Sequence, residues 1–390
     1  MEDKRYYSLA NYTLLQVIQA FATSLFLGSV YFWTKERYQY NNLQNLVLNA
    51  QQGFIYILCS RFGGKLSDRL GYNRQMMICT SVMAVILLLG WIPESACMPF
   101  LIIGGYIVFV AAFWPALEAV VMHVPASTSM PERIGNYNIN WAYSGAIGFF
   151  ISGLLFHWRP DSIFWVTAGL HLLVLYFLWF PIGWADAQGR MAMDIPHTGD
   201  EIPADRKRLF IHAAWLGNSI GYMMFASFMA MAPFIGEKFG LSSSTAIWLF
   251  STLFFSRLFS FVWFRRWQGW HYNLFWLILA ALAAPLSMTL VFFSSWLVVV
   301  FLGLACFGVV CGLSYYGSLY YSLDYGDNKG EHGGLHEMII GMGLFAGPLS
   351  GAMGSWWWGG LQGAQITTLG FAFLTAILGF AFLQVLHGKR

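Results

Sequence analysis

Charged residues inside long apolar runs are rare in this sequence, and they are the first candidates for chemistry. Glu118, Arg257 and Glu337 each lie in such a run, and His336 precedes the last of them. A charge surrounded by apolar side chains usually has a partner or a task. A carboxyl group or imidazole there can carry a proton, so Glu118, Glu337 and His336 are proton-coupling candidates. Arg257 is a candidate for binding an anionic substrate group or for pairing with a carboxylate.

The elements that carry these residues must themselves be apolar. Of 390 residues, 58% are hydrophobic and only 10% are charged, and the mean hydropathy is +0.57, whereas about a quarter of the residues in a soluble domain are charged. This composition indicates a membrane protein. The net charge of +3 is too small to indicate nucleic-acid binding, and the five cysteines lack metal-ligand spacing, so no disulfide, metal or cofactor is expected.

The apolar runs predict an all-α polytopic membrane protein with twelve transmembrane helices. A helix needs roughly 20 apolar residues to cross a bilayer, and the first run, which lacks a cleavage site, is expected to be retained. The predicted spans are residues 9–34, 43–66, 74–93, 98–123, 135–157, 162–183, 208–233, 242–264, 272–293, 296–321, 335–358 and 363–387.

Lysines and arginines orient these spans. Of 21 basic residues, sixteen fall on the side shared by the two termini and four on the other side. Because positively charged loops stay in the cytoplasm, both termini are predicted to be cytoplasmic in a bacterial-type inner membrane.

A polar segment, residues 183–208, divides the chain near its middle and has the composition of a linker. A shift of 198 residues places Gly135 on Gly333 and Gly145 on Gly343, which indicates two similar halves. The predicted units are a six-helix bundle of residues 1–183, a cytoplasmic linker of residues 184–207 and a six-helix bundle of residues 208–390.

The loop after the second predicted span carries a recognisable motif. Residues 64–74 read GKLSDRLGYNR, which resembles the major facilitator signature G-x-L-[SA]-D-R-x-G-x-x-R. Tyr72 and Asn73 depart from it, because the family usually has basic residues there. Together with the two halves of six helices, the motif makes the whole chain similar to the major facilitator superfamily (MFS), whose members are secondary transporters.

The resemblance implies a cytoplasmic gate built from the motif residues Gly64, Asp68, Arg69, Gly71 and Arg74. Gly64 would allow close helix packing, Gly71 would let the chain turn back, and Asp68 would face the positive end of the helix that begins near residues 333–336. The alternative is a turn with orienting charges. Glu118 could then form an ion pair with Arg69 or Arg74 instead of carrying a proton, and His336 and Glu337 could belong to the gate.

The resemblance also implies a central cavity between the halves. Polar residues at helical spacing and aromatic residues on the expected lining helices predict a cavity of amides and rings with little charge. The candidates are Gln16, Gln19, Gln52, Trp114, Asn138, Asn218, Tyr222, Arg257, Tyr315 and Tyr316. For each one, hydrogen bonding between helices is the alternative, and Arg257 could instead extend along its own helix to the membrane surface.

These features predict a secondary active transporter that moves a small organic solute by alternating access, coupled to protons. The cavity favours a neutral or weakly anionic solute, and amides with aromatic faces suit sugars and nucleosides. Two alternatives are an efflux antiporter for drugs or metabolites and a transporter-derived receptor or scaffold. An enzyme is not expected, because the sequence lacks HExxH and GxxxxGK motifs and has short loops. The expected partners are the solute, the lipid bilayer and the proton, and a monomer is expected.

Overall fold

The computed structural model describes residues 6–92, 94–125, 130–185, 202–325 and 329–387, with the side chains of all except residues 130–131, 323–325, 329–334 and 387. Within this part of the chain the regular structure is helical. The helices are α1 (Leu9–Tyr38), α2 (Asn42–Leu70), α3 (Tyr72–Gly90), α4 (Met98–His123), α5 (Met130–Trp158), α6 (Ser162–Trp179), α7 (Ala204–Lys238), α8 (Ser243–Phe250), α9 (Thr252–Arg266), α10 (Leu274–Phe293), α11 (Leu297–Tyr325), α12 (Lys329–Trp358) and α13 (Gly360–His387).

The twelve predicted spans are confirmed as helices. The pieces α8 and α9 follow one another with only Ser251 between them and form one span, Ser243–Arg266. Eleven of the twelve segments are long and apolar enough to cross a membrane.

The twelfth segment, α2, is more polar because its amides are satisfied inside the protein. Asn49 Nδ2 donates to the carbonyl oxygen of Ala226 at 2.7 Å, and Gln52 Nε2 donates to Tyr31 Oη at 2.7 Å. A buried polar group that is hydrogen-bonded avoids most of its desolvation cost. The amides of α2 therefore lie on its protein-facing side, whereas Phe54, Leu58 and Phe62 on its other side are exposed.

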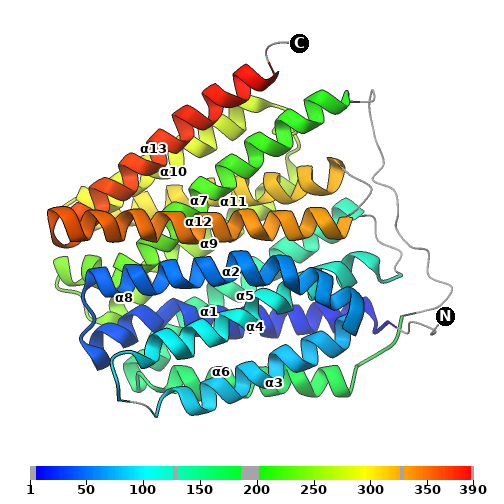
Figure 1. Ribbon diagram of the computed structural model, residues 1–390, viewed down its shortest axis with the longest axis horizontal. Coiled ribbons are helices and arrows are strands. Elements are labelled where there is room, and N and C mark those ends of the chain that lie inside the picture. Colours follow the sequence, from blue (N-terminus) through cyan, green and yellow to red (C-terminus); the bar gives the residue numbers. More distant parts are fainter. Residues whose placement is uncertain (1–5, 93, 126–129, 186–201, 326–328, 388–390) are drawn as a thin grey trace.

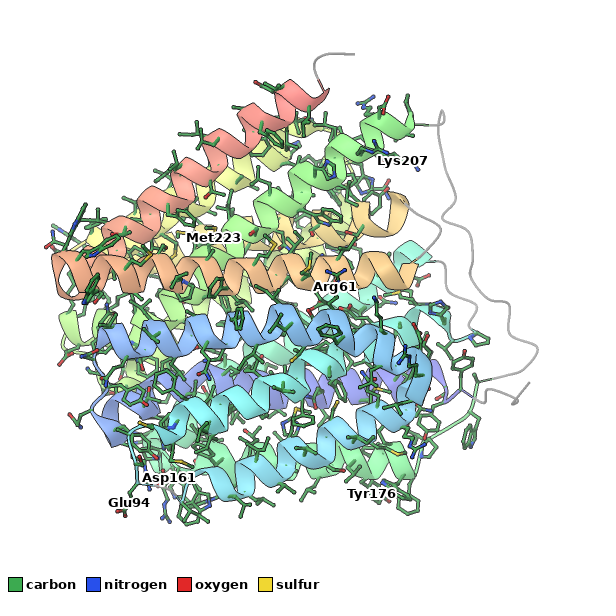
Figure 2. All side chains as sticks on the ribbon, viewed as in Figure 1. Arg61, Glu94, Asp161, Tyr176, Lys207 and Met223 are labelled. Carbon is green, nitrogen blue, oxygen red and sulfur yellow. The ribbon has the colours of Figure 1, made fainter. Side chains whose placement is uncertain are left out.

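The helices form two bundles that lie side by side (Figure 1). The first bundle contains α1 to α6 and the second contains α7 to α13, with α2 against α12 where the bundles meet. The start of α1 and the end of α13 lie at the same end of the molecule, here called the terminal end, and the other end is called the far end. Figure 2 shows Lys207 toward the terminal end and Glu94 and Asp161 at the far end.

Glycines allow α2 and α12 to approach closely. A Cβ atom at Gly53 would lie 2.3 Å from the backbone nitrogen of Phe345, and a Cβ atom at Gly341 would lie 2.8 Å from Ile57 Cγ1. Larger side chains would push the two helices apart. Small residues at helix contacts are the usual means by which membrane helices pack together.

Polar contacts join the two bundles at the far end. Lys35 at the end of α1 forms a 2.7 Å ion pair with Glu237 at the end of α7. Beside it, Ser243 Oγ at the start of α8 donates to Glu36 Oε1 at 2.5 Å. The bundles are therefore closed against each other on the far side of the interface.

Candidate functional site

A cavity of about 190 Å³ lies between the two bundles. Its walls come from α1, α2, α4 and α5 of the first bundle and from α7, α9, α11 and α12 of the second. Most of these helices contribute side chains spaced three or four residues apart, because these positions share one helical face, and α11 contributes Tyr315 alone. On α4 the face is Val110, Trp114 and Glu118.

The cavity is mostly apolar toward the far end, where its polar lining residues include Tyr31, Asn49 and Gln52, and its acidic side chains lie toward the terminal end. Successive helices run in opposite directions, so the chain order of the lining residues gives their depth. The far part contains Leu27, Phe149, Phe225, Met229 and Leu344, whereas the part nearer the terminal end contains Tyr56, Glu118, Tyr137, Tyr222, Tyr315 and Glu337. The groups capable of acid–base chemistry therefore gather at one end of the cavity.

Glu118 and Glu337 meet at this polar end, although they belong to different bundles. Tyr137 Oη donates to Glu118 Oε1 at 3.3 Å, and Tyr56 Oη donates to Glu337 Oε2. The two carboxyl groups line the same cavity and are near enough to interact electrostatically. Two carboxylates that share a buried site repel each other, which favours a proton on one of them. The pair can therefore hold a proton between α4 and α12.

Arg257 lies in the same cavity, surrounded by aromatic rings. Its side chain is 4% exposed, and Nη2 donates to Tyr222 Oη at 3.0 Å. Its guanidinium carbon lies 4.6 Å from the ring centroid of Trp141, 5.0 Å from that of Tyr315 and 5.6 Å from that of Phe261. These distances are in the range of cation–π contacts. Arg257 points into the cavity, so the alternative in which it reaches the membrane surface is wrong.

No carboxylate neutralises Arg257 among the described residues. The ion pairs in this part of the chain are Lys35–Glu237 and Arg37–Asp161, both at the far end, and Arg257 Nε has no hydrogen-bond partner. An unpaired buried charge is costly. The guanidinium group is therefore available to a ligand in the cavity.

Two aromatic pairs connect the bundles. One lies beside Arg257, and the other lies nearer the far end. Trp141 on α5 stacks on Tyr315 on α11, with ring centroids 5.4 Å apart and planes 3° apart. Nearer the far end, Phe149 on α5 stacks on Phe254 on α9 at 4.4 Å and 27°. Ala142 and Gly145 line the cavity between the two levels and leave space for a guest.

The structure brings seven of the predicted site residues to the cavity. They are Gln52, Trp114, Glu118, Tyr222, Arg257, Tyr315 and Glu337. The Glu118 ion pair with Arg69 or Arg74 is not formed, because Glu118 points into the cavity and both arginines are exposed. His336 lies beside the cavity, where Nδ1 is 2.9 Å from Ser318 Oγ.

The other predicted lining residues are buried outside the cavity. Gln19 Oε1 is 3.1 Å from His171 Nδ1, and His171 Nε2 is 3.0 Å from Tyr106 Oη, so this network connects α1, α4 and α6. Gln16 donates to the carbonyl oxygen of Tyr137, and Asn218 donates to Ser318 Oγ. Tyr316 packs on Trp270, and the fully buried Asn138 has no hydrogen-bond partner. The cavity therefore contains fewer amides than expected.

The loop motif is partly as expected. Gly71 has a φ of +86° between α2 and α3, where glycine allows the turn. Gly64 has no atom within 4 Å of an added Cβ, so it does not provide the predicted close packing. Its neighbour Gly63 does, because a Cβ there would lie 2.9 Å from the Cα of Ala112. Asp68 is exposed, and its predicted contact at residues 333–336 falls mostly on side chains that are not described.

The cavity residues that were not predicted from the sequence include Tyr56, Tyr137 and Trp141. Tyr56 lies four residues after Gln52, and Trp141 lies four residues after Tyr137. Helical spacing from Gln52 would have found Tyr56. The positions of Tyr137 and Trp141 depend on how α5 is rotated about its axis, which the sequence does not specify.

Two helical bundles around a central, partly polar cavity define a secondary transporter of the alternating-access class. The sequence model of the Major Facilitator Superfamily matches residues 12–348. The chain belongs to this superfamily, and it is a multi-pass membrane transporter.

Solved structures share the fold at low sequence identity. The nucleoside transporter NupG aligns with a TM-score of 0.71 at 13% identity, covering 98% of this chain and 99% of that chain. A bacterial homologue of the human lysosomal transporter Spinster, in an inward-facing and occupied conformation, aligns with a TM-score of 0.71 at 12% identity, covering 98% of this chain and 96% of that chain. No curated protein sequence matches the chain.

Proposed function

We propose that this protein is a proton-coupled transporter of a small organic solute in a bacterial inner membrane, with both termini in the cytoplasm. The observation that carries the proposal is the meeting of two buried carboxyl groups, Glu118 and Glu337, at the polar end of the central cavity. The two carboxyl groups belong to different bundles, so their protonation is linked to how the bundles are held together. The distribution of basic residues supports cytoplasmic termini. The polar linker of residues 184–207 supports a division into two bundles of residues 1–183 and 208–390.

The proposed cycle uses the shared proton as a bridge. With the proton bound, Glu118 and Glu337 hold α4 and α12 together on the terminal side of the cavity. When the proton leaves, two like charges face each other in a site of low dielectric constant, and their repulsion favours separation of the bundles. Release of the solute and of the proton toward the terminal side is thereby coupled.

Closure at the far end must be reversible for the same cycle. The side chains of Lys35 and Glu237 are 26% and 66% exposed, and an ion pair this exposed contributes only about 0–1 kcal/mol. Such a contact can break in each cycle. The far end can therefore open when the proton bridge closes the terminal side.

An efflux pump for hydrophobic cations fits the cavity less well. Arg257 lies among the cavity walls with a charge that persists at any physiological pH. A cationic guest would be repelled by it. The aromatic walls alone would suit such a drug, but the arginine favours neutral or anionic solutes.

Liposomes that contain the purified protein and a trapped pH-sensitive dye test the proposal. Inward gradients of benzenesulfonate, uridine and glucose are imposed in turn, and counterflow of each labelled solute is measured in parallel. We expect a transported solute to acidify the lumen, and Glu118→Gln and Glu337→Gln to abolish acidification while counterflow continues. Counterflow through the unmodified protein without any proton movement would contradict the coupling.

A further inference from the structure

The walls of the central cavity specify a narrower class of solute than the proposed function does. We infer that the substrate is a small aromatic monoanion, a planar ring with one carboxylate or sulfonate group, whose acid group binds Arg257. The inference rests on the proposed transport function, because it names the solute of the same cavity. Three features of the described lining residues support it: their charge, their hydrogen bonding, and the order of polar and aromatic side chains along the cavity.

The charge argument starts from Arg257. This guanidinium is 96% removed from solvent and has a free Nε, and it lacks an anionic partner among the described residues. Glu118 and Glu337 do not fill that role, since they accept hydrogen bonds from the hydroxyl groups of Tyr137 and Tyr56 and neither forms an ion pair with Arg257. An anionic guest group would satisfy the arginine with charge-assisted hydrogen bonds, which are the stronger kind.

The hydrogen-bonding argument disfavours sugars and other polyols. Two amide side chains, Asn49 and Gln52, line the cavity. One N–H group of each amide already donates, to the carbonyl oxygen of Ala226 or to Tyr31 Oη. A polyol needs a partner for each of several hydroxyl groups, and each one left without a partner would cost free energy.

The layering argument places the ring. Toward the far end, the space next to Arg257 is bounded by Phe225 and by the stacked rings of Phe149 and Phe254. Trp141 and Phe149 are eight residues apart on α5, which is about 12 Å along the helix axis. A single aromatic ring with a one-carbon acid group fits this interval, with its ring against the phenylalanines and its acid group toward Arg257.

Equilibrium binding to the purified full-length protein tests the inference with a matched set of probes. Benzoate carries the ring and the charge, benzamide keeps the ring without the charge, and cyclohexanecarboxylate keeps the charge without aromaticity. We expect benzoate and benzenesulfonate to bind, benzamide to bind at least about tenfold more weakly than benzoate, and cyclohexanecarboxylate to bind measurably more weakly than benzoate. Equal affinities for benzoate and benzamide would overturn the role of the charge, and equal affinities for benzoate and cyclohexanecarboxylate would overturn the role of the ring.

Variants locate the binding site. Arg257→Gln is expected to lose benzoate binding, and Arg257→Lys, which keeps the charge but not the planar fork, is expected to weaken it about tenfold or more. Arg159→Gln, an exposed arginine at the far end, is the matched control and should bind as the unmodified protein does. Unchanged benzoate affinity in Arg257→Lys would contradict the site even if Arg257→Gln failed to fold.

The two proposals fail in different ways. Benzoate binding without any proton-linked uptake of benzenesulfonate would refute the proposed coupling and leave the binding inference standing. Proton-linked uptake of uridine by a protein that does not bind benzoate would refute the aromatic monoanion and leave the coupling standing. Benzenesulfonate is used for transport because it stays charged and does not cross the bilayer as a neutral acid.

Discussion

Replacing Glu118 by glutamine tests whether the proposed contact between Glu118 and Glu337 depends on a bound proton. Glutamine has nearly the shape of a protonated glutamate, and its amide N–H can donate permanently to Glu337. The bridge between α4 and α12 should then persist whether or not a proton is available. Glu118→Ala removes the partner altogether and should leave the terminal side of the cavity more open.

The size of the effect follows from the bond that is lost. A hydrogen bond to a charged group contributes about 1.5–3 kcal/mol, which corresponds to roughly a 10- to 150-fold change in an equilibrium constant. Glu118→Ala should therefore increase the population that is open on the terminal side by about that factor under acidic conditions. Under alkaline conditions the unmodified protein should itself be open, and the difference should shrink.

Labelling of a cavity cysteine measures this population. Ala142→Cys lines the cavity wall, and the five native cysteines are first replaced by serine. A membrane-impermeant maleimide is applied from the terminal side, and each rate is normalised to that of the denatured protein at the same pH. We expect labelling to accelerate with rising pH in the unmodified background and to stay fast in Glu118→Ala. In Glu118→Gln, labelling should keep at every pH the slow rate that the unmodified background has under acidic conditions, a rate that reports the occasional openings that exchange requires.

The control is Glu94→Gln, which changes an exposed carboxylate at the far end. It should leave the labelling rates and their pH dependence unchanged. The reasoning is refuted if Glu118→Gln keeps the pH response of the unmodified background, or if that background shows no response at all.

Four further predictions concern helix packing, the far end, the Gln19 network and the energetics of transport. Gly63→Ala should lower thermal stability in detergent by about 1–3 kcal/mol, because the new methyl group meets the backbone of α4. Gly64→Ala has open space around it and should be neutral or stabilising by about 0.5–1 kcal/mol. Equal losses of stability in the two variants would contradict the contact between Gly63 and α4. A double-mutant cycle of Lys35→Ala and Glu237→Ala should give a coupling free energy of about 0.2–1 kcal/mol, and a value of several kcal/mol would rule out easy opening of the far end. Gln19→Leu should reduce stability by about 1–3 kcal/mol, because His171 Nδ1 loses its hydrogen-bond partner. Benzoate affinity should stay unchanged in this variant. A changed affinity would instead place Gln19 in the binding site. Uptake of one monoanion with one proton is electroneutral, so its rate should follow an imposed pH gradient and be insensitive to an imposed membrane potential.

The sequence predicts the helices well because a helix that crosses a membrane must have a minimum length and a high apolar content. Length and apolar content specify the spans, and even the polar α2 could be placed because it fell between two clear spans. Isolated charges within apolar runs were equally informative. Glu118, Arg257 and Glu337 were selected for that reason alone, and all three line the cavity.

What the sequence could not predict is the rotation of each helix about its axis. Gln16 and Gln19 share a face on α1, but periodicity does not tell which neighbour that face meets, and it meets the interior of the first bundle. Consecutive residues on a helix point about 100° apart. That single step explains why Gly63, and not Gly64, contacts α4.

Partner choice across the two bundles was also beyond the sequence. Glu118 lies near the loop arginines Arg69 and Arg74 in depth, so an ion pair with one of them was a reasonable alternative. The structure shows it bonded instead to Tyr137 and close to Glu337 in the cavity wall. Glu337 is more than 200 residues away along the chain, and only the packing of the two bundles brings it to Glu118.

The most direct test of the coupling is proton movement that accompanies solute entry. Liposomes that contain the protein and a trapped pH-sensitive dye are exposed to an inward gradient of labelled benzenesulfonate, or of whichever panel solute shows counterflow. We predict that the lumen acidifies as the label enters through the unmodified protein, and that Glu118→Gln exchanges label without acidification. Entry of the label with no change in luminal pH, or equal acidification by Glu118→Gln, would contradict the account.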